Sequence, residues 1–245
     1  MVSFSRLTRA AIPAALLGMA LALPARADQS DSIEFDLSLR GLSAGRLSVN
    51  GRIEGNRYSA NGTLKSTGIV GAIRKVRYDA AVAGAVSKNR FTPFKYSEQA
   101  DTSKRQSESV MAYKGGVPQV MVYSPPRDPR PGDVNPATQG GTIDPLTALY
   151  AVLRDIPESE ACTFRAVMFD GKRRSQIVLS SPEAGNGGIS CAGEYRRLEG
   201  FAPDEMAEKT RFPFRLTYGP AEPGRLRVVE VSMDTLYGKG RLKRR

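Results

Sequence analysis

The chain has 245 residues, a formal net charge of +11, and no histidine or tryptophan. The absence of histidine excludes Ser-His-Asp and Cys-His nucleophiles, histidine general acids and nearly all zinc sites. Two cysteines cannot form a tetrahedral thiolate zinc site either, so carboxylate, lysine, tyrosine and hard-cation chemistry remain.

Residues 1–27 have the pattern of a cleavable secretory signal peptide. Arg6 and Arg9 precede an apolar run over 10–23, which is shorter than the about 20 residues that a membrane-spanning helix needs. The small-residue pattern Ala25-Arg26-Ala27 follows and predicts cleavage before Asp28. We therefore expect a protein exported to the bacterial periplasm and soluble there, with a single β-rich domain over 28–245.

The charge and the cysteines both fit this compartment. Only three arginines and no acids lie in 1–27, so the mature chain keeps a net charge of +8. In a cell envelope such a surface meets lipopolysaccharide phosphates or anionic lipids rather than nucleic acid, although positive charge also serves solubility alone. Cys162 and Cys191, an even pair in an exported chain, predict a structural disulfide.

Apolar and polar residues alternate with period two along the first half of the mature chain, which predicts strands. Short turns separate these strands, and quick returns are typical of an up-and-down antiparallel meander. The predicted strands cover 33–39, 46–53, 57–65, 77–86, 90–98, 104–113 and 117–123.

The alternation stops at residues 124–143, which contain five prolines and three glycines. Such a segment cannot be a central strand and is expected to be a linker, a lid or disordered. Asp144 then predicts a helix N-cap with Pro145 at the first helical position, and the helix covers about 144–155. Its apolar positions at helical spacing are expected to lie on the sheet; they are Leu146, Leu149, Tyr150 and Leu153.

Strands resume after the helix, with Asp170-Gly171 as a hairpin turn between two of them. They are predicted over 162–169, 174–180, 189–197, 212–218 and 225–237. In the last of these, Val229, Val231 and Met233 are expected to face the interior.

Many two-faced strands and a single helix predict a sheet that curls into a closed or half-open barrel, with the helix on its concave side. Small inward residues, Ala60, Gly62, Ala80 and Gly84, either permit tight curvature or leave a cavity for an apolar guest. A transmembrane barrel is disfavoured because the sequence shows no aromatic girdle and ends in basic residues.

Three groups of residues are candidate binding sites. The first is the concave face, where we expect ligand contacts at Tyr58, Ala60, Gly62, Leu64, Tyr78, Ala80, Val82, Leu149 and Leu153. The second is a basic tail that either binds anions or is a frayed terminus; it consists of Lys239, Arg241, Lys243, Arg244 and Arg245. The third is Lys172-Arg173-Arg174, an anion-binding candidate beside a hairpin turn.

No catalytic residue, metal ligand or cofactor is predicted from the sequence. Asp144 and Asp170 are the only acids that invite a catalytic role, and a helix cap and a turn explain them. The sequence shows no carboxylate pair at a defined spacing and no glycine-rich phosphate loop after a strand.

Short motifs spread over the mature chain resemble the DUF3108 family of exported bacterial proteins of unknown function. They occur at 41–45, 76–78, 90–96, 141–149, 169–174 and 212–216, together with the proline-rich segment before Gly141. The resemblance implies a fold similar to the curved, half-open barrels of periplasmic lipoprotein carriers. It implies no catalytic or binding residues, because the family has no known function.

Two hypotheses of function follow. The leading one is a non-enzymatic periplasmic envelope protein that holds an apolar or amphiphilic guest, such as lipid, lipopolysaccharide or an acyl chain, on its concave face. The alternative is a structural or interaction module with a packed core that docks to anionic envelope partners. An enzyme ranks third. We expect neither nucleic-acid binding nor an integral membrane protein.

Overall fold

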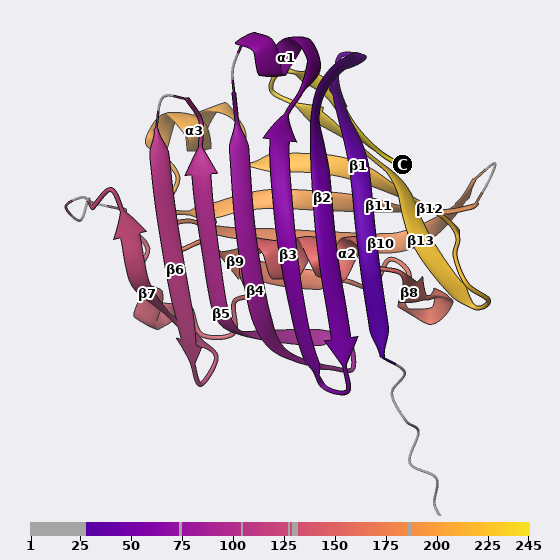
Figure 1. The fold of residues 1–245 in the computed structure, drawn as a ribbon, viewed down its shortest axis with the longest axis horizontal. Coiled ribbons are helices and arrows are strands. Elements are labelled where there is room, and N and C mark those ends of the chain that lie inside the picture. Colours follow the sequence, from indigo (N-terminus) through magenta and orange to yellow (C-terminus); the bar gives the residue numbers. More distant parts are fainter. Residues whose placement is uncertain (1–27, 74, 104, 127, 129–131, 186–187) are drawn as a thin grey trace, which may run out of the picture.

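The computed structural model describes residues 28–245 except 74, 104, 127, 129–131 and 186–187, so the predicted signal peptide lies outside the described residues. The first half of this part is a run of antiparallel strands joined by short turns (Figure 1). These strands are β1 Gln29–Leu39, β2 Leu42–Glu54, β3 Arg57–Ser66, β4 Arg77–Ser87, β5 Arg90–Asp101, β6 Gln106–Lys114 and β7 Val117–Ser124.

The strands of the second half belong to the same sheet and extend it beyond β1. Its strands are β8 Ile156–Pro157, β9 Arg165–Phe169, β10 Arg174–Gly185, β11 Gly188–Glu199, β12 Arg211–Pro220, β13 Arg225–Thr235 and β14 Gly238–Arg244. The order is β7-β6-β5-β4-β3-β2-β1-β14-β13-β12-β11-β10-β9, with β8 paired to β13, in one 14-stranded sheet. The last strand therefore pairs with the first, and this pairing joins the two halves.

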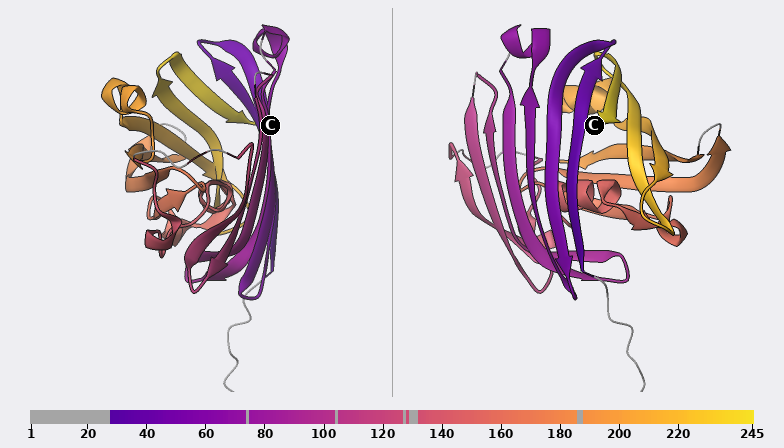
Figure 2. Two further views of the ribbon diagram at one scale, coloured as in Figure 1. Left: turned by 90° about the vertical axis from the view of Figure 1, so that its left-hand side faces the viewer. Right: turned by 45° about the vertical axis from the view of Figure 1, so that its right-hand side comes forward.

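The sheet curls into two facing layers. Strands β1–β6 stand upright in Figure 1, and the orange strands β9–β12 cross behind them. The edge-on view in Figure 2 shows the two layers diverging from the side where β1 meets β14. The path ends at β7 and β9 rather than closing. The predicted curled antiparallel sheet is confirmed, in its half-open form.

The helix α2, Pro145–Leu153, lies between the two layers (Figure 1). Asp144 caps it by accepting a hydrogen bond from the Thr147 N–H at 2.8 Å, and Arg154 ends it in an extended conformation. The predicted helix is thus confirmed. Its burial differs from a one-sided apolar face, because β3, β4 and β5 contact it on one side and β9 on the other. The buried side chains are Leu146, Thr147, Ala148, Tyr150, Ala151, Val152 and Leu153.

The expectation of a single helix is wrong. Two further short helices occur, α1 over Gly68–Ile73 and α3 over Pro203–Glu208. Single 3-10 turns form at Pro136–Thr138 and Glu158–Glu160. All four are too short for helical periodicity to reveal them in the sequence.

The end of the proline-rich segment is part of the packed structure. Gln139, Thr142 and Ile143 are buried. Ile143 donates its N–H to the Val167 carbonyl and accepts from the Phe169 N–H, which covers part of the β9 edge. A short parallel bridge therefore occupies a position where the sequence predicted only a linker, a lid or disorder.

The basic tail is a strand and not a frayed terminus. β14 lies between β1 and β13, with Leu242 opposite both Leu37 and Val231. Arg244 is 10% exposed, lies 3.7 Å from Asp155 and stacks over a phenyl ring. Further ion pairs join other tail residues to neighbouring strands. The tail therefore has a structural role that its charge pattern did not indicate.

A β-bulge corrects one predicted inward position of the last long strand, Val229, whereas Val231 and Met233 pack against the core as predicted. The register between β12 and β13 shifts at Thr217 and Tyr218. Before the shift, Leu226 and Val228 are buried, while Val229 is only partly buried. The bulge adds one residue to β13, so inward-facing residues are even-numbered before it and odd-numbered after it. Strict alternation cannot anticipate that change.

The predicted disulfide between Cys162 and Cys191 is present, with 5.4 Å between the Cα atoms. It links the segment before β9 to β11. Both residues are buried in the continuous apolar core that also contains α2.

Candidate functional site

The concave face of the first layer changes from apolar to polar across the strands. One cross-strand row runs through Val49, Gly62, Ala80, Glu98 and Ser109, each directly opposite the next on strands β2 to β6. The parallel row beside it is Leu47, Leu64, Tyr78, Ala100 and Ser107. Both rows are apolar on β2–β4 and polar on β6, so the polarity changes perpendicular to the strands.

An apolar cavity of about 460 Å³ lies over the apolar end of these rows. Leu47, Leu64 and Ala80 form its sheet side, and Leu146 and Leu149 of α2 form the opposite wall. Ligand sites in proteins are roughly 300–1,000 Å³ and mostly apolar. The cavity therefore has the size and lining of a small-ligand site.

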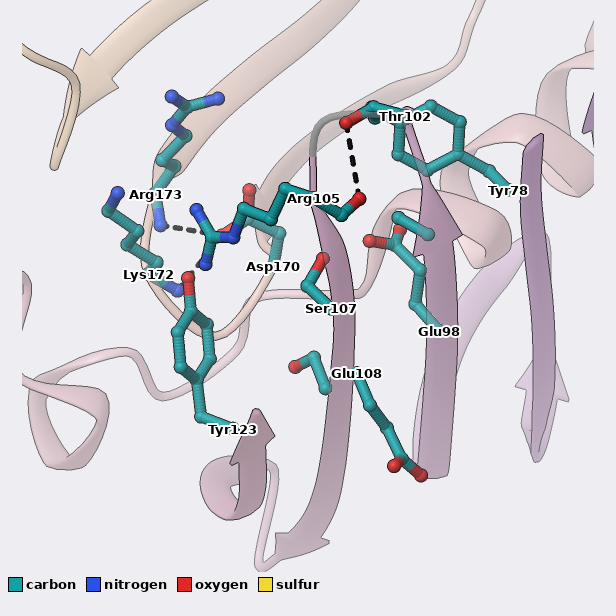
Figure 3. A pocket seen from close by; sticks show the side chains of 12 residues that line it. Tyr78, Glu98, Thr102, Arg105, Ser107, Glu108, Tyr123, Asp170, Lys172 and Arg173 are labelled. Atoms are coloured by element: carbon teal, nitrogen blue, oxygen red, sulfur yellow. Dashed lines mark hydrogen bonds between the residues drawn. The ribbon is translucent and has the colours of Figure 1, made fainter. Parts of the chain in front are cut away.

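A polar cavity of about 320 Å³ adjoins the apolar one, and the two share Tyr78 and Glu98 as lining residues. Figure 3 shows its far wall, the hairpin between β9 and β10, which carries Lys172 and Arg173. Arg105, just before β6, extends across the cavity toward this hairpin in the same view. The two cavities therefore lie side by side at Tyr78 and Glu98, one with an apolar and the other with a polar lining.

Glu98 stands where the two cavities meet, and its partner is Tyr96. The Tyr96 hydroxyl donates a hydrogen bond to the Glu98 carboxylate at 2.7 Å. Burial has the largest effect on the pKa of Glu98 and raises it. The hydrogen bond from Tyr96 lowers this pKa, and the charge of Asp170 raises it. Burial also raises the pKa of Tyr96 well above its ordinary value, so the phenol remains a donor at neutral pH.

The hairpin opposite Glu98 is held by Asp170. Its carboxylate accepts the backbone N–H groups of Lys172 at 2.9 Å and Arg173 at 2.6 Å, which confirms the predicted turn. Burial raises the pKa of Asp170, while these backbone hydrogen bonds lower it. The turn thereby projects two cationic side chains over the polar cavity.

The predicted concave-face residues divide into two groups. Five of them line the apolar cavity: Gly62, Leu64, Tyr78, Ala80 and Leu149. The other four lie in the packed core beside it: Tyr58, Ala60, Val82 and Leu153. The Tyr58 hydroxyl lies 2.7 Å from the Thr147 Oγ1, and Thr147 donates in turn to Asp144. This chain of hydrogen bonds anchors α2 to β3.

Two glycines on the concave face make room for side chains of α2. A Cβ atom on Gly62 would lie 2.7 Å from Leu146 Cδ1. A Cβ atom on Gly51 would lie 2.1 Å from a ring carbon of Tyr150. Gly62 and Ala80 both border the apolar cavity, and the smallness of Gly62 also serves helix packing.

Sequence alternation missed Glu98 because of a bulge in β5. The register between β4 and β5 jumps from Lys95 to Pro93, so Phe94 has no partner and is exposed. Inward positions are odd before the bulge, as at Phe91, and even after it, as at Glu98. Pro93, which has no N–H for the ladder, was the available signal for an irregular strand.

The basic tail lies on β14, and the structure does not bring it to the polar cavity. Lys172 and Arg173 do line that cavity. Within the described residues, no group of three or more acidic or cysteine side chains is placed to hold a metal ion. No helix of that same part of the chain is long and apolar enough to cross a membrane.

The comparisons with known proteins agree with this fold. A family described as "Protein of unknown function (DUF3108)" matches residues 34–185. No curated protein matches the sequence. The crystal structure of a β-barrel-like protein of the domain of unknown function DUF1849 from Brucella abortus is similar, with a TM-score of 0.51 and 11% identity. That similarity covers 88% of this chain and 95% of the Brucella chain, and at such low identity it shows the fold alone.

Proposed function

The chain belongs to the DUF3108 family, and we propose that it is a periplasmic binding protein for an amphiphile whose acyl chain occupies the apolar cavity. The observation that carries this proposal is the polarity change along the paired rows of β2–β6. An apolar chain lying along the rows would leave its polar end at Glu98, where the polar cavity begins.

The energetics of the apolar cavity favour a hydrocarbon chain. Each methylene removed from water contributes about 0.8 kcal/mol. Leu47, Leu64, Leu146 and Leu149 line the cavity with aliphatic groups, which offer a polar ligand few hydrogen bonds. A chain of several methylenes would therefore gain free energy there, while a sugar or nucleotide would lose its hydration.

The role we propose is binding without catalysis. The two acids singled out from the sequence serve the fold, because Asp144 caps α2 and Asp170 holds its hairpin turn. Their carboxylates accept backbone N–H groups and are oriented by them.

Three features support a periplasmic location. Residues 1–27 have the pattern of a secretory signal peptide. The disulfide between Cys162 and Cys191 is of a kind that persists in oxidising compartments. The net charge of +8 suits a compartment bounded by anionic lipids.

Native mass spectrometry of protein purified from periplasm without detergent tests the proposal. We expect a stoichiometric adduct that solvent extraction releases as an acyl-chain lipid. Replacing Ala80 by Phe places a ring in the cavity and should remove the adduct. Gly62 is unsuitable for this test, because a side chain there displaces Leu146.

The matched control is Ala83→Phe. Ala83 is exposed and lies on β4, the strand that also contains Ala80, between the buried residues Val82 and Gly84. The control should keep both the fold and the adduct. Retention of the adduct by the Ala80→Phe protein, or failure of delipidated wild type to bind any acyl amphiphile, would overturn the proposed function.

A further inference from the structure

Cationic side chains face the polar cavity from two sides. Arg105 extends from the end of the β5–β6 connection toward the β9–β10 hairpin, and that hairpin carries Lys172 and Arg173, which also line the cavity (Figure 3). Neither Arg105 nor Lys172 forms an ion pair with another residue in the part of the chain that the structure describes. Arg173 is partly engaged, because its guanidinium lies 3.2 Å from Glu205. Two cationic groups thus remain available to a ligand.

Among the described residues, no acidic side chain around this cavity forms an ion pair with either of those two cations. Asp170 accepts the backbone N–H groups of its own turn, and its charge interacts with Lys172 and Arg173 without a direct ion pair to Lys172. The side chain of Glu108 extends away from the other labelled groups in Figure 3, as expected for a residue between the inward Ser107 and Ser109. Glu98 shares its carboxylate with the Tyr96 hydroxyl, and burial disfavours its charged form by raising its pKa.

A buried hydroxyl adds a second, independent observation. Ser109 is 7% exposed, lines the polar cavity, and its Oγ has no hydrogen-bond partner among the described residues. A buried polar group without a partner costs about 1–3 kcal/mol. A ligand oxygen in the cavity would supply the missing partner.

Resting on the proposed function, we propose that the polar cavity binds a phosphate-bearing headgroup, with Arg105 and Lys172 holding it from opposite walls. A phosphate presents oxygens in several directions and forms strong charge-assisted hydrogen bonds with such cations. The Ser109 hydroxyl can donate to a further oxygen. Tyr78 and Glu98, which line both cavities, mark the junction between headgroup and acyl chain.

Isothermal titration calorimetry with delipidated full-length mature protein tests this inference. The probes are a monoacyl glycerophosphate and a monoacylglycerol with the same acyl chain, both below their aggregation concentrations, and glycerol phosphate alone. Charge-assisted hydrogen bonds to the phosphate predict that the glycerophosphate binds at least about tenfold more tightly than the monoacylglycerol. The double variant Arg105→Gln, Lys172→Gln should lose that difference and still bind both lipids.

The control double variant is Arg57→Gln, Lys95→Gln, which removes the same charge from exposed positions on β3 and β5. It should retain the headgroup preference. Equal affinity for the two lipids in wild type, or an unchanged preference in the Arg105 and Lys172 variant, would overturn the headgroup inference and leave acyl-chain binding standing. Glycerol phosphate binding as tightly as the monoacyl lipid would instead overturn the proposed function, since the acyl chain would then contribute nothing to affinity. Failure of both lipids to bind would also overturn the proposed function.

Discussion

The ionisation of Asp144 is coupled to the stability of this fold. It is fully buried, and burial raises its pKa to about 6, against the hydrogen bonds from Thr147. Since the folded-state pKa exceeds the ordinary value of 3.8, the folded protein takes up this proton more readily than the unfolded chain. The stabilisation from protonation is present at low pH and is lost as pH rises through about 6.

Replacing Asp144 by Asn should therefore remove part of the pH dependence of stability. A difference of about two pKa units corresponds to on the order of 3 kcal/mol between the protonated and the charged protein. We expect the free energy of unfolding of the variant to improve relative to wild type as pH rises from about 4 to about 7. Urea unfolding of both proteins over this range measures the difference. A constant difference would show that Asp144 titrates at its ordinary pKa.

Single residues also show what local sequence chemistry can and cannot reveal. The N-cap at Asp144 and the turn at Asp170 were predictable because their partners lie within three residues. The roles of Gly51 and Gly62 were not predictable, because the atoms that require their smallness belong to Tyr150 and Leu146 on a distant helix. Contacts across long sequence separations leave no periodic signal.

At the scale of elements, alternation located most strands but not their irregularities. The bulge at Phe94 brings Glu98 to the concave face, and the shift at Thr217 and Tyr218 buries Val228. Each bulge depends on the pairing with a neighbouring strand, so one strand's sequence does not specify it. The apolar half of the candidate site was therefore largely predictable from the sequence, whereas in the polar half only Lys172 and Arg173 were indicated.

The structural role of β14 as a strand can be tested separately from the role of its charged side chains. Deleting 239–245 removes a central strand and leaves the edges of β1 and β13 without hydrogen-bond partners. Leu37 and Val231 also lose Leu242, their common neighbour. We expect the truncated protein to lose cooperative unfolding in urea, as followed by circular dichroism.

A charge-neutralised protein provides the control for the truncation. It keeps the strand and replaces four tail residues by glutamine: Lys239, Arg241, Lys243 and Arg245. Exposed ion pairs contribute about 0–1 kcal/mol each, so this variant should fold with a modestly lower urea midpoint. A truncated protein as stable as wild type would refute the structural role of β14, and collapse of the neutralised protein would assign that role to the charges.

For the whole molecule, the pairing of β1 with β14 decides the shape. It joins the two layers on one side, and the other side stays open between β7 and β9. The sequence predicted the curl from the need to cover an apolar face, but it did not indicate which strands would meet. The open side is where the polar cavity lies, between β5–β7 and the β9–β10 hairpin. The same incomplete closure thus gives the proposed headgroup site its access.

The disulfide stabilises the second layer by linking the segment before β9 to β11. It closes a loop with a sequence separation of 29 residues, and loop-closure entropy predicts a stabilisation of roughly 3–4 kcal/mol. Replacing Cys162 and Cys191 by Ala should lower the free energy of unfolding by about that amount, with near-native circular dichroism, because the bridge acts mainly on the unfolded chain. Reductant should lower the urea midpoint of wild type toward that of the double variant and leave the variant unchanged. If reduction leaves the wild-type midpoint where it was, the layer is held by its core and by the β8–β13 and Ile143 pairings without the covalent bridge.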